Sequence, residues 1–315
     1  MDKKVVVIGV PVDTNIDEES LEVKRMAICK TLPSLSDSIS KTGYSLLSQR
    51  FSSKKFILRG NVNVPEWLLP LPPVETFPLL NPIARIEFIK KDGLRAITEK
   101  VEEVVFSLGD EVPFLISEEH CMSYGSFKAL KRKGKNPLFL CFDSHIDIIS
   151  ISSRLGRKEE NYFSSANFIL KMVEDKILEP GDVFIIGSSE KFLKGSPPYK
   201  ELSGLRKRGL KIMDKSHILR GYVPEIPDGY KEIYISIDTD VCAGERTCAV
   251  RTRNFTGIPP SIFLTFFKNL VKKFKNKEIV GMDLCEIDVL VADSSEDETL
   301  NFWVEVIKIL IDEAL

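Results

Sequence analysis

The sequence predicts an α/β protein with a three-layer architecture, a central parallel sheet with helices on both faces. Two observations support this prediction. Short apolar runs rich in Val, Ile and Phe recur along the chain, and their continuous hydrophobicity is typical of strands buried on both faces. Helix-like segments separate these runs, and an alternation of strands with helices favours a parallel sheet. The predicted strands are residues 4–12, 113–117, 137–143, 182–188, 231–238 and 277–284.

The elements follow one another from the N-terminus. The run KVVVIGVPV at 4–12 is the first predicted strand, and residues from about 13 to 90 form a less regular third of the chain. Within it, the stretch PEWLLPLPPVETFP at 65–78 carries prolines that exclude a central strand or a continuous helix. From residue 94 onward, helices and strands alternate. The predicted helices are residues 94–107, 123–132, 164–176, 260–274 and 297–313.

We expect the whole chain, residues 1–315, to fold as a single domain. A length of 315 residues fits one large domain or two modest ones. The sequence has no internal repeat, no low-complexity tract and no Gly/Ser-rich hinge after the proline-rich stretch. The less regular N-terminal third is therefore interpreted as an elaboration of the same domain.

The charge balance argues against nucleic acid as a partner. The chain has 44 Lys and Arg against 46 Asp and Glu, with a formal net charge of −2. Its basic runs, KALKRKGK at 128–135 and KNLVKKFKNK at 268–277, lie at predicted helix ends and are interpreted as solvated helix faces. No segment approaches the roughly 20 apolar residues that span a bilayer. We therefore expect neither nucleic acid nor a membrane as a partner.

The cysteines indicate a reducing compartment. The six cysteines are scattered without a CxxC pair, and several lie inside apolar runs, where a buried thiol behaves as a small hydrophobic group. The apolar run near the N-terminus is too short for the hydrophobic region of a secretory signal peptide. The sequence therefore predicts a cytoplasmic protein with reduced thiols.

Polar residues with a period of two follow two of the predicted strands. Asp143, His145 and Asp147 alternate in DSHID, and Asp238 and Asp240 alternate in SIDTD. Alternate residues of an extended chain project to one side, and open α/β sheets bind ligands beyond the carboxyl ends of their strands. Because like carboxylates raise one another's pKa, such a group requires neutralising cations. The pattern predicts a site for two divalent metal ions.

Further candidates stand at two other strand ends. The segment SEEH ends in His120, and GMDLCEID contributes Glu286 together with Asp283 and Asp288, neither of which is counted as a ligand. Oxygen-rich ligands with one imidazole for each ion suit Mn²⁺, and less decisively Zn²⁺, Fe²⁺ or Co²⁺. Two such ions together lower the pKa of a shared water toward neutrality. The implied reaction is metal-assisted hydrolysis.

Four motifs resemble those of the ureohydrolases, the family of arginase and agmatinase. DSHID at 143–147 is similar to their Asp-Ala-His-x-Asp, and SIDTD at 236–240 to their Ser-x-Asp-x-Asp. GMDLCE at 281–286 matches their Gly-x-Asp-x-x-Glu. EEHC at 118–121, followed by Gly125, resembles Gly-Gly-Asp-His-Ser, but it keeps the histidine and loses the glycines. The motifs occur in the family's order over roughly the last two thirds of the chain.

This resemblance implies a fold like that of arginases and deacetylases, two Mn²⁺ ions, a small guanidino substrate and a homotrimer or homohexamer. It assigns to the first ion the ligands His120, Asp143, Asp147 and Asp238. It assigns to the second ion the ligands His145, Asp143, Asp238 and Asp240. Glu286 matches the residue that binds the guanidinium group, where a carboxylate suits a planar cation with several N–H donors. Asp147 would also accept a hydrogen bond from the attacking water and pass its proton to the leaving amine.

The sequence departs from the family pattern where a histidine usually relays protons. The corresponding stretch, FSSANF at 163–168, offers only Ser164, Ser165 and Asn167. The chain has three histidines, and the third, His217, is interpreted as a surface or capping residue. The chain therefore lacks the relay histidine that its motifs imply.

Two other departures affect the loops around the predicted site. The family's Asp-x-Asp-x-x-Asp-Pro is DTDVCAG at 238–244 here, without the third aspartate and the proline. The residues that bind the amino-acid head of arginine in arginases have no clear match in IISISSRLGRKEEN at 148–161. Agmatine or another guanidino compound is therefore left open as the substrate.

Three hypotheses follow. The first is a binuclear hydrolase that cleaves a C–N bond of a linear guanidino or amidino substrate, as agmatinase or arginase does. The second is a catalytically reduced, metal-binding member of the same fold with a scaffold or regulatory role, which the missing relay histidine favours. The third is the related one-zinc deacetylase class. It ranks last because the chain has no His-His pair and keeps His120 and Asp240.

Overall fold

The computed structural model describes residues 3–31, 41–51, 55–149, 162–189, 197–242, 256–294 and 298–315. Within these ranges, eight strands form one sheet in the order β2-β1-β3-β8-β7-β4-β5-β6. Every neighbouring pair is parallel. The strands are β1 Val5–Val10, β2 Phe56–Asn61, β3 Val112–Ser117, β4 Leu138–Phe142, β5 Val183–Gly187, β6 Lys211–Asp214, β7 Glu232–Asp238 and β8 Glu278–Cys285.

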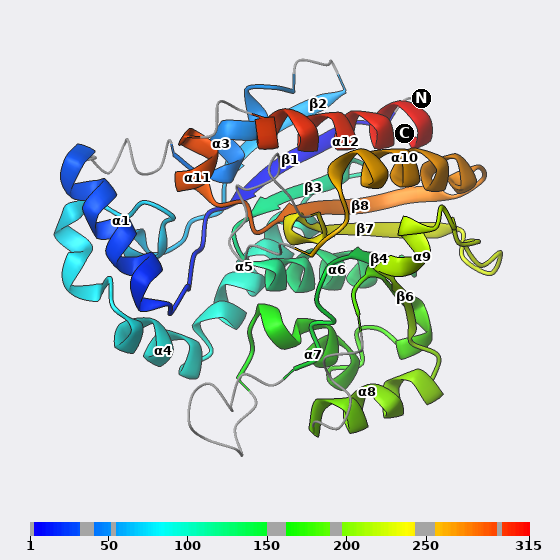
Figure 1. The fold of residues 1–315 in the computed structure, drawn as a ribbon, viewed down its shortest axis with the longest axis horizontal. Coiled ribbons are helices and arrows are strands. Elements are labelled where there is room, and N and C mark those ends of the chain that lie inside the picture. Colours follow the sequence, from blue (N-terminus) through cyan, green and yellow to red (C-terminus); the bar gives the residue numbers. More distant parts are fainter. Residues whose placement is uncertain are drawn as a thin grey trace.

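Helices cover both faces of this sheet (Figure 1). The helices α3 Gly43–Ser48, α10 Pro260–Val271 and α12 Glu298–Ala314 lie on one face. The helices α5 Gly93–Phe106, α6 Ser123–Arg132, α7 Phe168–Glu174 and α8 Pro197–Lys207 lie on the other. The described part of the chain also contains α1 Glu18–Thr31, α4 Pro82–Lys90, α9 Lys215–Leu219 and α11 Val289–Ser294. The predicted three-layer fold is thereby confirmed.

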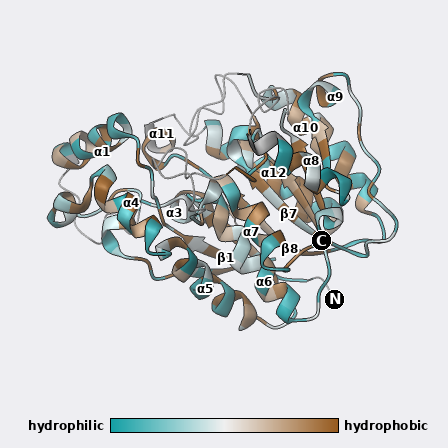
Figure 2. Ribbon diagram, turned by 90° about the horizontal axis from the view of Figure 1, so that it is seen from below, coloured by the Kyte–Doolittle hydropathy of each residue, from teal (hydrophilic) through white to brown (hydrophobic). Residues whose placement is uncertain are grey.

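The two hydrophobic cores follow from the alternation of side chains along each strand. In β1, Val5 and Val7 belong to the core under α10 and α12, whereas Val6 and Ile8 belong to the core under α5 and α6. The central strands therefore need apolar residues at every position, which is the continuous pattern seen in the sequence. Figure 2 shows apolar strands in the middle of the molecule and helices whose outer faces are more polar.

The six predicted strands are confirmed, and two strands were missed. Both missed strands, β2 and β6, lie at the edges of the sheet. β2 has the sequence FILRGN and is largely exposed, and β6 is only four residues long. An edge strand is covered less completely than a central one, so its sequence carries a weaker apolar signal.

The five predicted helices are present as well, with two changes. The segment predicted as a helix at 260–274 consists of α10 followed by a 3₁₀ turn, Lys272–Phe274. The segment predicted as a helix at 164–176 consists of a 3₁₀ turn, Ser165–Asn167, followed by α7. The N-terminal third is more regular than the sequence predicts, because it contains β2 and the three helices α1, α3 and α4. The proline-rich stretch forms two 3₁₀ turns, Glu66–Leu68 and Val74–Leu79. Over the described ranges, no helix combines the length and the apolar character needed to cross a membrane.

Two glycines allow close packing near the predicted site. A Cβ atom on Gly125 of α6 would lie 2.2 Å from the carbonyl oxygen of Thr98 in α5, so only glycine permits this helix contact. A Cβ atom on Gly281 of β8 would lie 2.7 Å from the ring of Tyr234 in β7. Both glycines belong to the sequence motifs, and their role in the structure is to make room for packing.

Candidate metal centre

The predicted ligands gather beyond the carboxyl ends of three strands. His120 lies in the 3₁₀ turn that follows β3, Asp143 follows β4 directly, and Asp238 is the last residue of β7. Asp240 lies in the next turn, Thr239–Val241. In the sheet, β8 lies between β3 and β7, and β4 pairs with β7. The carboxyl ends of these central strands therefore lie close to one another.

The first group of ligands surrounds His120. Its Nδ1 atom lies 3.0 Å from Asp147 Oδ2, 3.2 Å from Asp143 Oδ2 and 3.4 Å from Asp238 Oδ2. All four residues are buried. One imidazole nitrogen and three carboxylate oxygens therefore converge on a single point.

The second group surrounds His145. Its Nδ1 atom lies 2.8 Å from Asp240 Oδ2 and 3.6 Å from Asp143 Oδ1. The two oxygens of Asp143 thus face the two imidazoles, one each. Asp238 presents one oxygen to His120, while its other oxygen accepts a hydrogen bond from the backbone N–H of Asp240 at 2.9 Å. The side chain of His145 is half exposed, so the group opens to solvent on this side.

The donor atoms fit divalent cations. Among the described residues, the buried atoms His120 Nδ1, Asp143 Oδ2 and Asp240 Oδ2 have no hydrogen-bond partner. Buried polar atoms are normally satisfied, so such a cluster indicates that another group completes the site. Ligand atoms of Asp143, His145 and Asp240 all lie within 4.8 Å of one another, close enough to share an ion. The structure brings the six predicted residues together, and their role as ligands stays a prediction.

The pKa values in the cluster reflect its excess of negative charge. Burial opposes ionisation of Asp143, yet the neighbouring imidazoles of His120 and His145 hold its pKa below the usual range. Burial and the neighbouring carboxylates raise the pKa values of Asp147 and Asp238 well above normal. The two imidazoles therefore compensate only part of the charge of the carboxylates, and divalent cations would favour the ionised form of all of them.

The outer side of His120 faces a hydrogen-bonded chain inside the sheet. His120 Nε2 lies 2.9 Å from Ser236 Oγ, and Ser236 Oγ donates to Asp283 Oδ1 at 2.7 Å. Tyr234 donates its hydroxyl to Asp283 Oδ2 at 2.8 Å. Such a chain favours a proton on Nε2 and leaves Nδ1 as the metal-binding nitrogen. Sequence reasoning missed Ser236 as a partner of His120, because this contact joins β7 to the turn after β3 and has no local signal.

The two residues predicted to be catalytic have strained backbones. Asp147 has φ 50° and Glu286 has φ 62°, in the left-handed region that favours glycine. Each such residue costs about 1–3 kcal/mol, and this strain is typical of functional sites. The backbone N–H of Glu286 donates to the carbonyl oxygen of Ser117 at 3.0 Å, and its carbonyl oxygen accepts from Thr239 Oγ1 at 3.0 Å. These bonds fix Glu286 between the ends of β3 and β7.

The stretch without the relay histidine lies close to His120. The ring of Phe168 packs on the ring of His120, with centroids 4.6 Å apart. Asn167 accepts a hydrogen bond from the backbone N–H of Ser164, and Ser165 donates to Glu119. His217 lies in α9 and is exposed, in agreement with its interpretation as a surface residue.

Parts of two departures from the family pattern lie outside the described residues. The structure describes IISISSRLGRKEEN only through residue 149 and DTDVCAG only through Cys242. The predictions made for the remaining residues of these stretches are therefore not tested.

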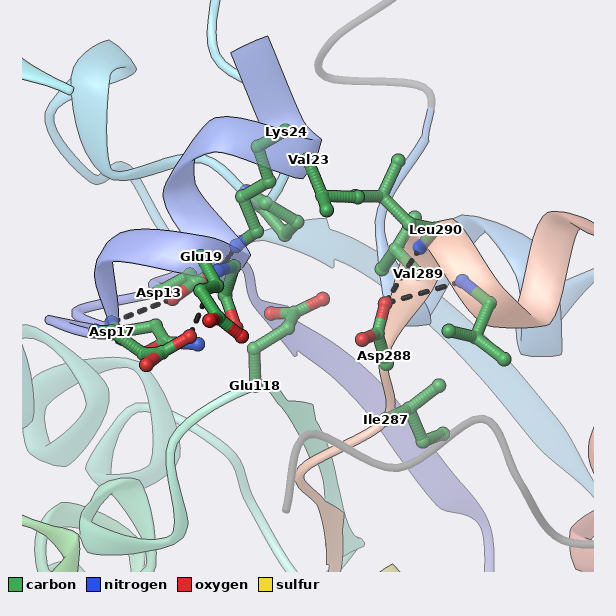
Figure 3. A pocket seen from close by; sticks show the side chains of 14 residues that line it. Asp13, Asp17, Glu19, Val23, Lys24, Glu118, Ile287, Asp288, Val289 and Leu290 are labelled. Atoms are coloured by element: carbon green, nitrogen blue, oxygen red, sulfur yellow. Dashed lines mark hydrogen bonds and ion pairs between the residues drawn. The ribbon is translucent and has the colours of Figure 1, made fainter. Parts of the chain in front are cut away.

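A separate cavity of about 490 Å³ lies on the same side of the sheet, beyond the carboxyl ends of β1, β3 and β8. It is lined by Asp13 and Lys24, which form an ion pair, by Glu118, and by residues 287–291 after β8. Figure 3 shows the side chain of Glu118 between Asp13 on one side and Asp288 on the other. Burial raises the pKa of Glu118 to about 8. None of the six predicted ligands lines this cavity.

Known structures share the fold over almost the whole chain. Arginase from Bacillus cereus superposes with a TM-score of 0.64 at 13% identity, covering 99% of this chain and 100% of its own. Agmatine ureohydrolase of Thermoplasma volcanium gives 0.59 at 16% identity, covering 99% and 90%. Formiminoglutamase from Trypanosoma cruzi, solved with Mn²⁺, gives 0.62 at 14% identity, covering 99% and 94%.

Comparison of the sequence with other proteins and with family models gave different results. None of the proteins with a curated function matches the chain. In contrast, the model of the arginase family matches residues 3–310. The four motifs lie inside this range, and the resemblance drawn from them is confirmed. Because the match spans nearly the entire sequence, the chain belongs to the arginase family.

Proposed function

We propose that the chain is a binuclear metal-dependent hydrolase that cleaves a C–N bond of a linear guanidino or amidino compound. The observation that carries this proposal is the arrangement around Asp143, whose two oxygens face two imidazoles: His120 also contacts Asp147 and Asp238, and His145 also contacts Asp240. Membership of the arginase family, whose members compared above include an arginase and an agmatine ureohydrolase, supports the reaction class.

Two Mn²⁺ ions are the proposed cofactors. His120, Asp143, Asp147 and Asp238 would hold one ion, and His145, Asp143, Asp238 and Asp240 would hold the other. When bound, the ions would supply an activated water nucleophile at neutral pH. The mixture of imidazole and carboxylate ligands suits Mn²⁺ and also admits other divalent ions.

The side chains of the protein have two proposed roles in the reaction. Glu286 binds the planar guanidinium or amidinium group, because a carboxylate accepts hydrogen bonds from its N–H donors and balances its charge. This contact fixes the carbon that is attacked. Asp147 accepts a proton from the attacking water and delivers it to the amine that leaves. The strained backbones of both residues support their assignment to the site.

An assay of product release tests the proposal. The full chain loaded with Mn²⁺ is incubated with agmatine, arginine, guanidinobutyrate and guanidinopropionate, and urea is measured. We expect urea from at least one of these compounds and its loss in Glu286→Gln and Asp147→Asn. A chain that holds two metal ions yet releases no urea from any of them would contradict a guanidino-hydrolase function.

A second candidate function is a catalytically reduced, metal-binding protein with a scaffold or regulatory role. The specific observation in its favour is the stretch from Ser164 to Phe168, which has no histidine and whose Ser165 and Asn167 side chains already hydrogen bond within the protein. The same assay decides between the two, since this candidate predicts metal binding without turnover.

We also infer a cytoplasmic location and a homotrimer or homohexamer, the first from the reduced cysteines and the second from the family resemblance. Light scattering coupled to gel filtration measures the mass in solution. A monomeric mass at micromolar concentration would contradict the inferred oligomer.

A further inference from the structure

The carboxylate of Glu119 joins three chain segments that are far apart in the sequence. Its Oε1 atom accepts hydrogen bonds from the backbone N–H of Thr14 at 2.8 Å and from the Thr14 hydroxyl at 2.6 Å. Its Oε2 atom accepts from the hydroxyl of Ser165 at 2.6 Å. Glu119 is only 2% exposed, so these bonds are shielded from water. Hydrogen bonds to an ionised carboxylate are roughly twice as strong as those between neutral groups.

These contacts bear directly on His120, the residue that follows Glu119. Ser165 touches both neighbours of His120, because its hydroxyl donates to Glu119 and accepts from the backbone N–H of Cys121 at 3.4 Å. The carbonyl oxygen of Glu119 accepts from the backbone N–H of Met122 at 3.2 Å and from the Ser117 hydroxyl at 2.9 Å. The turn that carries His120 is thus held at its backbone and through the side chain of Glu119.

The same contacts hold the ring of His120 from a second direction. Ser165 begins the 3₁₀ turn that leads into α7, and Phe168 at the start of α7 packs on the His120 ring. If Ser165 lost its bond to Glu119, this turn and the Phe168 ring would be free to shift. His120 Nδ1 would then lose its alignment with the three carboxylates around it.

We propose that Glu119, together with Thr14 and Ser165, is a positioning residue for the metal ion on the His120 side of the centre. This role rests on the proposed binuclear function and deepens it. Ser165 stands in the stretch where the family motif implies a relay histidine. Its hydroxyl donates to the buried carboxylate of Glu119, so in this chain the stretch from Ser164 to Phe168 holds the turn that carries His120 in position.

The test measures Mn²⁺ affinity in the full chain by titration calorimetry, with one half of the site removed at a time. In an Asp240→Asn background, the ion on the His120 side is the one that stays. There, Ser165→Ala and Thr14→Val, each of which removes one donor to Glu119, should weaken Mn²⁺ binding about tenfold, the effect typical of groups that orient metal ligands. In an Asp147→Asn background, where the ion on the His145 side stays, Ser165→Ala should leave the affinity unchanged.

Glu102→Gln is the matched control for a general loss of stability. Glu102 is also buried and accepts hydrogen bonds from charged groups, namely Arg132 at 2.8 Å and Lys128 at 2.8 Å, but it lies in α5 and outside the metal centre. We expect this variant to unfold at a lower temperature and to bind Mn²⁺ as the wild-type chain does.

The outcomes separate this inference from the proposed function. A wild-type chain that binds no Mn²⁺ overturns both. If the wild-type chain binds two ions and Ser165→Ala and Thr14→Val retain full affinity in the Asp240→Asn background, only the positioning role is overturned. An equal loss of affinity in Glu102→Gln, or in both backgrounds, would also overturn it, because the effect would then be one of stability.

Discussion

At the scale of single residues, Asp143 is the centre of the candidate site. Its Oδ2 atom lies 3.2 Å from His120 Nδ1, and its Oδ1 atom lies 3.6 Å from His145 Nδ1. Oδ1 also accepts a hydrogen bond from the backbone N–H of His145 at 2.6 Å, which fixes the plane of the carboxylate. One side chain therefore links the two halves of the centre.

Asp143→Asn should reduce the bound Mn²⁺ to one ion or none, because an amide supplies a neutral and weaker ligand to both halves. Elemental analysis after dialysis measures the metal content. Asp288→Asn is the control, since Asp288 accepts from the backbone N–H groups of Leu290 and Val291 and asparagine caps a helix equally well. Retention of both ions in Asp143→Asn would show that the ligand assignment is wrong.

Two substitutions in the hydrogen-bonded chain of Ser236, Asp283 and Tyr234 distinguish an effect on the orientation of His120 from an effect on stability. Ser236→Ala removes the partner of His120 Nε2 and one of the donors to Asp283, so we expect about tenfold weaker Mn²⁺ binding and a loss of about 1–3 kcal/mol in the free energy of unfolding. Tyr234→Phe removes a donor to Asp283 without touching His120. It should lower stability similarly while Mn²⁺ affinity stays constant, and equal effects of both variants on affinity would refute the orienting role.

At the scale of elements, the contact between α5 and α6 depends on Gly125. A Cβ atom at this position would meet the backbone of Thr98 and the side chain of Val101, both in α5. The α5–α6 pair is held further by Glu102 of α5, which bonds Lys128 and Arg132 of α6. The close packing of these two helices therefore rests on one glycine and on two ion pairs of Glu102.

Gly125→Ala should lower the free energy of unfolding by about 1–3 kcal/mol, because its Cβ atom would lie 2.2 Å from a backbone oxygen and the helices would have to separate. Gly204→Ala in α8 is the matched control, since no atom lies within 4 Å of its new Cβ. There, the better helix propensity of alanine should add up to about 1 kcal/mol. Chemical denaturation measures both changes, and unchanged stability in Gly125→Ala would contradict the packing argument.

The elements also show which part of the fold the sequence made predictable. The strands β1, β3, β4, β5, β7 and β8 are covered on both faces, so each needs a run of apolar residues that stands out in the sequence. The edge strands are covered less completely and can carry polar residues or glycine: β2 contains Arg59 and Gly60, and β6 begins with Lys211. Their assignment depends on pairing with β1 and β5, which is a contact between distant segments.

At the scale of the whole molecule, the parallel sheet brings together the polar residues that follow its strands. Each connection between parallel strands runs back to the amino end of the next strand, so all carboxyl ends point the same way. The carboxyl ends of β3, β4 and β7 therefore lie close together although they are far apart in the sequence. Two apolar cores, one on each face of the sheet, hold these strands in place although the carboxylates repel one another. Cations bound among the carboxylates would relieve this repulsion and stabilise the folded chain.

Saturating Mn²⁺ should therefore raise the midpoint of thermal unfolding, and a chelator should lower it. A ligand that binds only the folded state contributes about 2.7 kcal/mol at a concentration one hundred times its Kd. Differential scanning calorimetry with and without Mn²⁺ measures the shift, and Asp143→Asn, which weakens both ion sites, is the control that should respond little. A wild-type midpoint insensitive to Mn²⁺ would count against a metal centre.

The sequence by itself determined the class of this protein and the residue types of its site. Buried strands impose apolar runs, a property of a single extended segment, and the carboxylate and imidazole residues that follow these runs indicate the ligand types. Only the tertiary structure decided which oxygen faces which imidazole, that Ser236 and Asp283 support His120, and that Glu119 ties Thr14 to Ser165. These are contacts between segments that meet only after the sheet has formed, so no local pattern encodes them.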